Sequence, residues 1–141
     1  MKNISRKIIL PLFILGAFIV FNACNKQTDS NIAPTIQLKT GPGYTSDSTS
    51  TIGPATAIKV GIVASESGSE DYLNTFTVSH AFDGNAPIQD STKVLSQNEH
   101  RTFEEDINFT TRSNPGTEVY YFTVTNQNGK LATTSVSFTV R

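Results

Sequence analysis

The chain of 141 residues contains one cysteine, no tryptophan and two histidines. A single thiol, Cys24, cannot form a disulfide within the chain, so apolar packing must hold the fold together. Basic residues are scattered and never cluster with aromatics, which argues against nucleic-acid binding, because that requires concentrated positive charge. The sequence contains no glycine-rich phosphate loop. No reaction can therefore be assigned from motifs, and we expect a protein that is not an enzyme and needs no cofactor.

The N-terminal region has the three-part layout of a secretory signal. Its first seven residues carry three basic side chains and no acid. The apolar run Ile8–Phe21 follows, and small Ala23 directly precedes Cys24. Fourteen apolar residues are fewer than the roughly 17 to 25 of a transmembrane helix. We therefore predict a helical signal peptide over residues 1–23, and the remaining chain, with 8 basic and 12 acidic residues, has a net charge of −4.

The sequence Phe-Asn-Ala-Cys at residues 21–24 resembles the lipobox of bacterial lipoproteins, in the style of Bacteroidota. The resemblance implies that Cys24 carries diacylglycerol, is the first residue after cleavage and is acylated at its amino group. The protein would then be anchored by lipid in the cell envelope. Because no aspartate follows the cysteine, the outer membrane is favoured, with its periplasmic and surface faces both open. An ordinary cleaved signal and an uncleaved signal-anchor remain alternatives.

Two further segments follow the predicted signal peptide. Residues 24–33 are polar and lack aromatics, so we expect a lipidated N-terminus and a flexible tether. From Pro34 to Arg141 apolar residues recur at every second position, in runs separated by turn residues at intervals of about ten. This period is typical of half-buried strands. The expected inward sets are Ile36 and Leu38; Ile58, Val60 and Ile62; Phe76, Val78, His80 and Phe82; Phe103, Glu105, Ile107 and Phe109; Tyr120, Phe122 and Val124; and Val136, Phe138 and Val140.

The pattern predicts an all-β fold, a single antiparallel sandwich of about seven strands over residues 34–141. Its last two runs, joined by Asn-Gln-Asn-Gly at 126–129, resemble the closing strands of bacterial immunoglobulin-like domains. The resemblance implies a tyrosine corner at Tyr120 or Tyr121, in which the hydroxyl bonds to the backbone. The antibody Cys…Trp…Cys core is absent, so Phe, Ile and Val must supply the packing.

Few residues indicate chemistry. His80 is in phase with apolar neighbours and is expected at a strand boundary, and nothing shows that it converges with His100. Glu104, Glu105 and Asp106 should alternate between the faces of a strand, which does not build a paired-carboxylate site. Such charges protect a sheet edge from unwanted pairing. We therefore predict no catalytic, cofactor-binding or metal-binding residue.

Two binding alternatives stay open. The acidic loop with Glu66, Glu70 and Asp71 could hold calcium, although its spacing matches no regular calcium motif. Tyr44 and Tyr72 are the available loop aromatics, and together on one exposed face they would form a stacking surface for a glycan. The leading interpretation is a lipid-anchored envelope lipoprotein that presents an immunoglobulin-like binding or structural module. The alternative is a glycan-binding accessory lipoprotein of a polysaccharide-capture system, and the partner is open in both.

Overall fold

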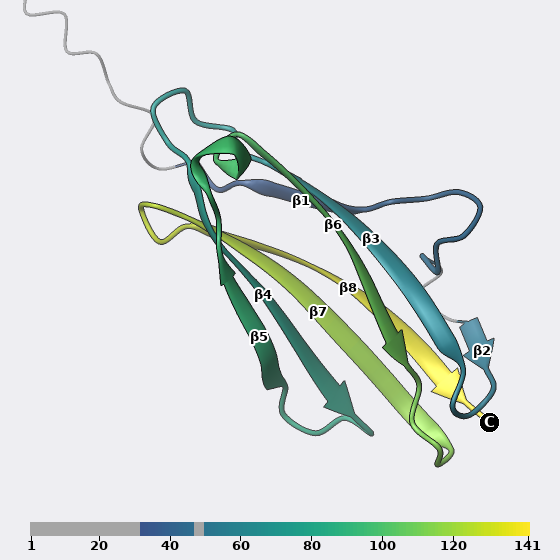
Figure 1. Ribbon diagram of the computed structural model, residues 1–141. Coiled ribbons are helices and arrows are strands. Elements are labelled where there is room, and N and C mark those ends of the chain that lie inside the picture. Colours follow the sequence, from purple (N-terminus) through teal and green to yellow (C-terminus); the bar gives the residue numbers. More distant parts are fainter. Residues whose placement is uncertain (1–31, 47–49) are drawn as a thin grey trace, which may run out of the picture.

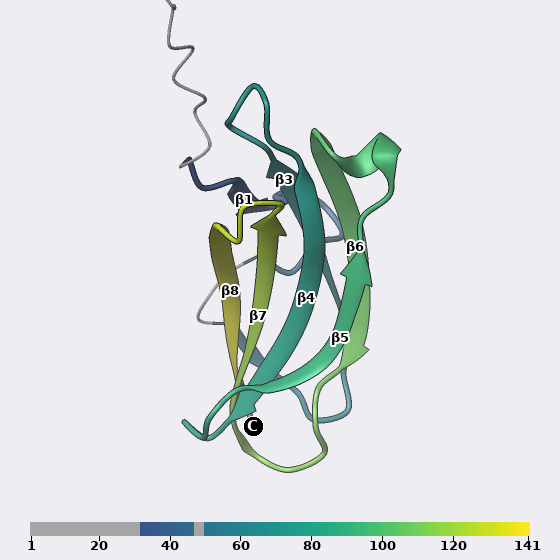
Figure 2. The same ribbon diagram turned by 90° about the vertical axis from the view of Figure 1, so that its left-hand side faces the viewer.

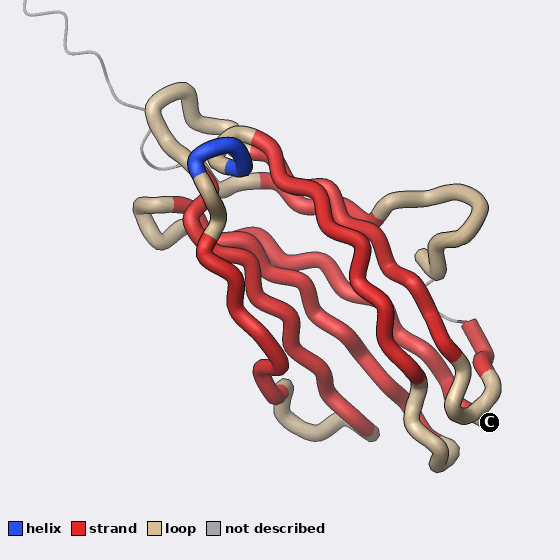
Figure 3. The backbone as a smooth tube through the Cα atoms, in the orientation of Figure 1, coloured by secondary structure: helices blue, strands red, loops and turns tan. Residues whose placement is uncertain are grey.

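The computed structural model describes residues 32–46 and 50–141, and its regular structure is almost all β-strand (Figures 1 and 3). One short 3₁₀ helix, η1 (Gln97–Glu99), precedes the sixth strand. The strands are β1 (Thr35–Leu38), β2 (Ser50–Ile52), β3 (Ala57–Ser65), β4 (Leu73–Phe82), β5 (Ile88–Val94), β6 (Thr102–Thr110), β7 (Gly116–Asn126) and β8 (Leu131–Val140). The expected signal helix, Cys24 and most of the tether lie outside the described residues.

The strands form two sheets that pack face to face, as the side view in Figure 2 shows. One sheet has three strands in the order β1-β3-β6, and the other has five in the order β2-β8-β7-β4-β5. This confirms the all-β sandwich expected from the sequence, with eight strands in the described residues. One pair, β2 with β8, is parallel rather than antiparallel, because the chain crosses from the first sheet to the second between β1 and β2 and then runs in the direction of β8.

The core lies between the sheets and contains the apolar sets that the two-residue period predicted. Ile58, Val60 and Ile62 of β3 face the buried residues of β7 and β8. Aromatic rings join the two layers, since Phe76 of β4 lies 5.0 Å from the ring centre of Phe103 on β6. Apolar area removed from water contributes about 25 cal/mol per Å², so this interdigitated layer is the main stabilising term of a fold without a disulfide.

Two tight turns have the left-handed backbone that their residues favour. Between β4 and β5, Asp83 and Gly84 have φ of 54° and 75°, which fits a primed hairpin turn. Between β7 and β8, Gly129 has φ of 74°, and the Asn126 side chain accepts hydrogen bonds from the amides of Asn128 and Lys130 at 3.1 and 2.9 Å. The second turn is the hairpin that the sequence predicted.

A buried carboxylate braces the end of the sandwich where β6 leads into β7. Glu118 is fully buried and accepts hydrogen bonds from the Arg112 amide at 2.7 Å and from the Tyr120 hydroxyl at 2.9 Å. The Arg112 guanidinium forms a bidentate pair with Asp83, with both distances 2.6 Å. Burial, and then the hydrogen bond to Glu118, raise the pKa of Tyr120. The Tyr120 hydroxyl therefore bonds to a side chain, whereas a tyrosine corner would direct it to the backbone.

Gly116 is the residue of this brace that tolerates no side chain. Its φ is +146°, and a Cβ would overlap the Arg112 guanidinium and the Asp83 carboxylate. We expect Gly116→Ala to lower the free energy of unfolding by roughly 1–3 kcal/mol, through backbone strain and displacement of the ion pair. Gly53→Ala is the matched control, because its Cβ would meet only the Thr56 hydroxyl at 3.2 Å. Chemical denaturation of both variants measures the difference, and equal losses would contradict this account of the brace.

Candidate functional site

The best-formed hollow of the described residues lies between the free edges of β5 and β6. Each of these strands has a single hydrogen-bonded neighbour, β4 for β5 and β3 for β6, so each leaves one edge unpaired. The two edges flank the same side of the sandwich, as Figure 2 shows. A three-stranded sheet cannot fully cover a five-stranded one, and the gap remains here. We name this gap the β5–β6 groove.

The groove has a volume of about 320 Å³ and combines an apolar floor with polar rims. Phe76 and Val78 of β4 and Ile107 of β6 supply the apolar surface. Alternation along β6 directs Ile107 inward, but the free edge leaves its side chain only half-buried. The lining residues are Phe76, Val78, Ser91, Lys93, Glu105, Asp106, Ile107 and Asn108. An apolar floor with a few polar groups is the usual composition of a binding pocket.

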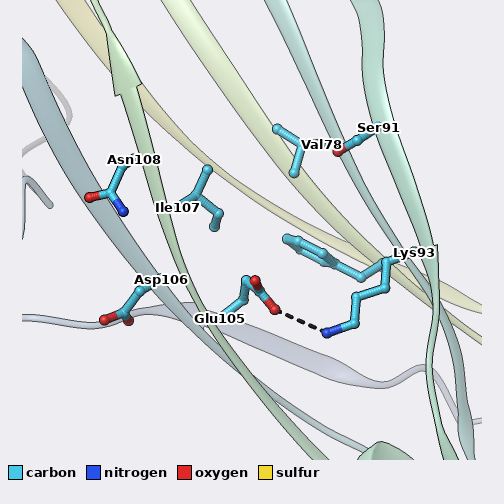
Figure 4. Close-up of a pocket in the computed structure, with 8 residues that line it drawn as sticks. Val78, Ser91, Lys93, Glu105, Asp106, Ile107 and Asn108 are labelled. Atoms are coloured by element: carbon cyan, nitrogen blue, oxygen red, sulfur yellow. Dashed lines mark hydrogen bonds and ion pairs between the residues drawn. The ribbon is translucent and has the colours of Figure 1, made fainter.

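An ion pair spans one end of the groove. Figure 4 shows Lys93 and Glu105 extending toward each other, with 3.1 Å between Nζ and Oε2. Lys93 also contacts Glu99 at 2.9 Å and lies 4.8 Å from the ring centre of Phe103. The hydrogen bond from Glu99 raises the pKa of Lys93, while hydrogen bonds from the Ser96 hydroxyl and then Lys93 lower the pKa of Glu99 to about 2. All three groups are therefore charged at neutral pH, and the groove is closed here by hydrated charges rather than by backbone.

A histidine and an aspartate flank the other end of the groove. His80 Nδ1 lies 2.6 Å from Asp90 Oδ1, and the imidazole is tilted against the ring of Phe82 with centres 4.5 Å apart. The pairing of β4 with β5 shifts register between Val78 and Ser79, so Asp90 is an extra residue in β5. His80 is half-buried at a strand boundary, which confirms the expectation for this residue.

The outer face of the three-stranded sheet carries a charged cluster on the next residue of β6. Asp106 pairs with Lys59 at 2.7 Å and Lys39 at 3.1 Å, and the Tyr44 hydroxyl donates to it at 3.1 Å. Hydrogen bonds from Lys59 and then Lys39 lower the pKa of Asp106 to about 2. Glu105 points into the groove while Asp106 points outward, so the predicted alternation of the acidic run is confirmed.

Tyr44 and Tyr72 do not form a common stacking surface. Tyr44 covers Gly61 on the outer face of β3, whereas Tyr72 stacks on His100 at the η1 end of the sandwich, with ring centres 4.4 Å apart. Because His100 precedes Thr102, the partner of Ser65, the two tyrosines are separated by about four residues of strand, or about 13 Å. The glycan alternative thus lacks the paired aromatics on which it depended.

The remaining candidates serve the loops that hold them. His100 lies beside Leu73 at the start of β4, about 23 Å of strand from His80. Glu66 accepts hydrogen bonds from the amides of Ser67 and Gly68 in its own loop, and Asp71 binds the side chains of the β7–β8 turn. Within the residues that the structure describes, no three His, Cys, Asp or Glu side chains gather as a set of metal ligands.

Sequence reasoning missed the groove because it missed β5. The segment Ile88–Val94 is exposed at all seven positions and has no apolar period, so nothing distinguished it from a loop. Its only signal was the bracketing by a turn sequence and by buried Leu95. The Asp106 cluster was also missed, because residues 39–45 must first fold back over β3 to bring Lys39 and Tyr44 to Asp106.

Comparison with known proteins supports the fold alone. No protein-family model and no curated protein matches the chain. Among solved structures, it is similar to superoxide reductase (neelaredoxin) from Ignicoccus hospitalis, at 9% identity and a TM-score of 0.52, over 78% of this chain and 81% of that one. A substituted form of that protein gives 10% identity and the same TM-score, over 77% and 80% of the two chains. Murine CRIg matches 78% of this chain and 98% of its own at 10% identity, with a TM-score of 0.39.

The depressed pKa of Asp106 predicts a specific loss of stability in acid. Its carboxylate has a pKa of about 2 in the folded chain against 3.8 ordinarily, so its contribution is present above pH 4 and lost as pH falls through 2. We expect Asp106→Asn to be less stable than the parent chain at pH 6, with the difference vanishing near pH 2. Urea denaturation at pH 6, 4 and 2 measures it. Lys59→Met should show the same convergence, and a difference that stays constant with pH would refute the assignment.

Proposed function

We propose that this chain is a non-enzymatic, lipid-anchored lipoprotein of the cell envelope whose immunoglobulin-like sandwich presents a binding surface. Cys24 is the lipid attachment site in this proposal. Each buried methylene contributes about 0.8 kcal/mol, so two or three acyl chains form a stable anchor where one would not. The tether between Cys24 and the sandwich is short, which keeps the module close to the membrane.

The observation that carries the proposal is the place where the chain enters the sandwich. The Asn126 side-chain amide donates to the carbonyl of Ile32 at 3.2 Å, which fixes the entering chain beside the β7–β8 turn. The C-terminus lies at the opposite end, after β8 (Figure 1). An anchor eight residues before Ile32 would thus hold the module by one end. It would leave the β5–β6 groove along the side, and the turns at 83–87 and 111–115, accessible to a partner.

The described part of the chain does not supply another means of crossing a bilayer. Over residues 32–46 and 50–141, no helix has both the length and the apolar character of a transmembrane span. Membrane attachment in this proposal therefore rests on the cysteine and on the apolar segment that precedes it.

Substitution of the thiol tests the anchor directly. We expect Cys24→Ser to move the protein from the membrane pellet to the supernatant after cell lysis and to abolish labelling with radioactive palmitate, because a serine hydroxyl does not accept the diacylglyceryl group in a thioether. The matched control is Asn25→Ser, which changes the next residue and keeps the thiol. Sedimentation of the Cys24→Ser protein with the membranes, or palmitate labelling that persists, would disprove the anchor.

A further inference from the structure

We infer that the β5–β6 groove binds an extended segment of a partner protein, added as a strand beside β6, in which apolar side chains alternate with lysine or arginine. This inference rests on the proposed function as a binding module and names its partner class. Strand addition to a free sheet edge gains affinity from backbone hydrogen bonds, and side chains at alternate positions give it specificity.

The backbone of β6 is the edge suited to pairing. All nine of its residues pair with β3 in one uninterrupted register, from Thr102 opposite Ser65 to Thr110 opposite Ala57. The edge of β5 is broken by the extra residue Asp90, and a bulge of this kind hinders strand pairing. The sheet of β1, β3 and β6 also has three strands, where an immunoglobulin constant domain has four in the corresponding layer. An added strand beside β6 would supply the fourth.

The floor of the groove determines which side chains would point inward. Phe76 and Val78 lie opposite Ile107, and none of their atoms offers a hydrogen bond. A space of about 320 Å³ accommodates one or two aliphatic side chains from an incoming strand. Their burial would complete the cover over Ile107, which the free edge leaves half-buried. The inward positions of the partner are therefore apolar.

The charges on the rim select a basic partner. Three carboxylates, those of Asp90, Glu99 and Glu105, face the single ammonium of Lys93 along the groove. Glu99 and Glu105 share that ammonium, at 2.9 and 3.1 Å. A lysine or arginine of the partner could take Glu105 while Lys93 stays with Glu99. Exposed ion pairs add little net stability, so exchanging one for another opens the groove at small cost.

The same charges disfavour a second copy of this chain as the occupant. Antiparallel pairing of β6 with itself would bring the acidic run Glu104–Asp106 against the same run of the other copy. Like charges directly opposite each other in neighbouring strands are destabilising. The acidic run therefore blocks self-association along β6 and attracts strands of opposite charge.

A defined peptide tests the inference on the full-length chain in detergent micelles. The probe is a blocked nine-residue peptide with valine at every second position and lysine or threonine between. We expect it to bind in calorimetric titration and to slow amide hydrogen exchange in residues 102–110. The same peptide with glutamate in place of lysine should bind at least about tenfold more weakly. A version with proline at the central valine should not bind, because it cannot form the backbone pairs.

Two substitutions on β6 provide the matched comparison. Ile107→Lys places a charge on the groove floor and should abolish binding, whereas Asn108→Lys changes the adjacent residue on the other face of the strand and should not weaken it. Glu105→Lys should reverse the preference, so that the acidic peptide binds more tightly than the basic one. This reversal is a gain that misfolding cannot imitate.

Several results would overturn the inference. These are no binding of the basic peptide, equal binding of the acidic one, or protection from exchange away from residues 102–110. A dimer by light scattering that the peptide does not dissociate, with β6 protected, would instead assign the edge to a second copy. None of these results bears on Cys24, so the anchor can stand while the groove assignment falls, and the reverse also holds.

Discussion

The unequal width of the two sheets is the constraint from which the other features of this molecule follow. Three strands must cover five, and with no disulfide available the cover depends on side chains that cross between the layers. Phe103 against Phe76 and Phe109 against Tyr120, with ring centres 5.0 and 3.9 Å apart, join the layers toward the β6 side. Beyond these rings the cover ends, and the groove begins where apolar packing runs out.

The two ends of the sandwich are stabilised by different chemistry. At the end where the chain enters, the side chain of Asn126 organises its own turn and also bonds to the carbonyl of Ile32. At the opposite end a fully buried Glu118 joins the β6–β7 connection to the core, and Arg112 extends this link to the β4–β5 turn through Asp83. A buried carboxylate is costly unless its oxygens are hydrogen-bonded, and both oxygens of Glu118 are.

Charge at the sheet edges reconciles a stable monomer with an available binding surface. Glu105 and Lys93 point inward from their edges, which hinders aggregation because any strand that enters must satisfy them. The outward acid, Asp106, is already held by two lysines and a tyrosine hydroxyl. The groove is thus unfavourable for an arbitrary strand and open to one that brings the complementary charge. Edge protection and partner selection are two effects of the same side chains.

Alternation of apolar residues determined the fold class, the six core strands and the inward direction of Glu105, because period-two burial is a local property that any two-sheet packing must respect. The 126–129 turn was equally legible, since its asparagines and glycine suit a hairpin. Only the tertiary structure decided where β5 lies, because an exposed strand such as Ile88–Val94 obtains its conformation from pairing with β4 and not from its own side chains. It also decided the groove, the separation of Tyr44 from Tyr72 and the burial of Glu118. Each of these depends on contacts between segments distant in sequence, which no local pattern encodes.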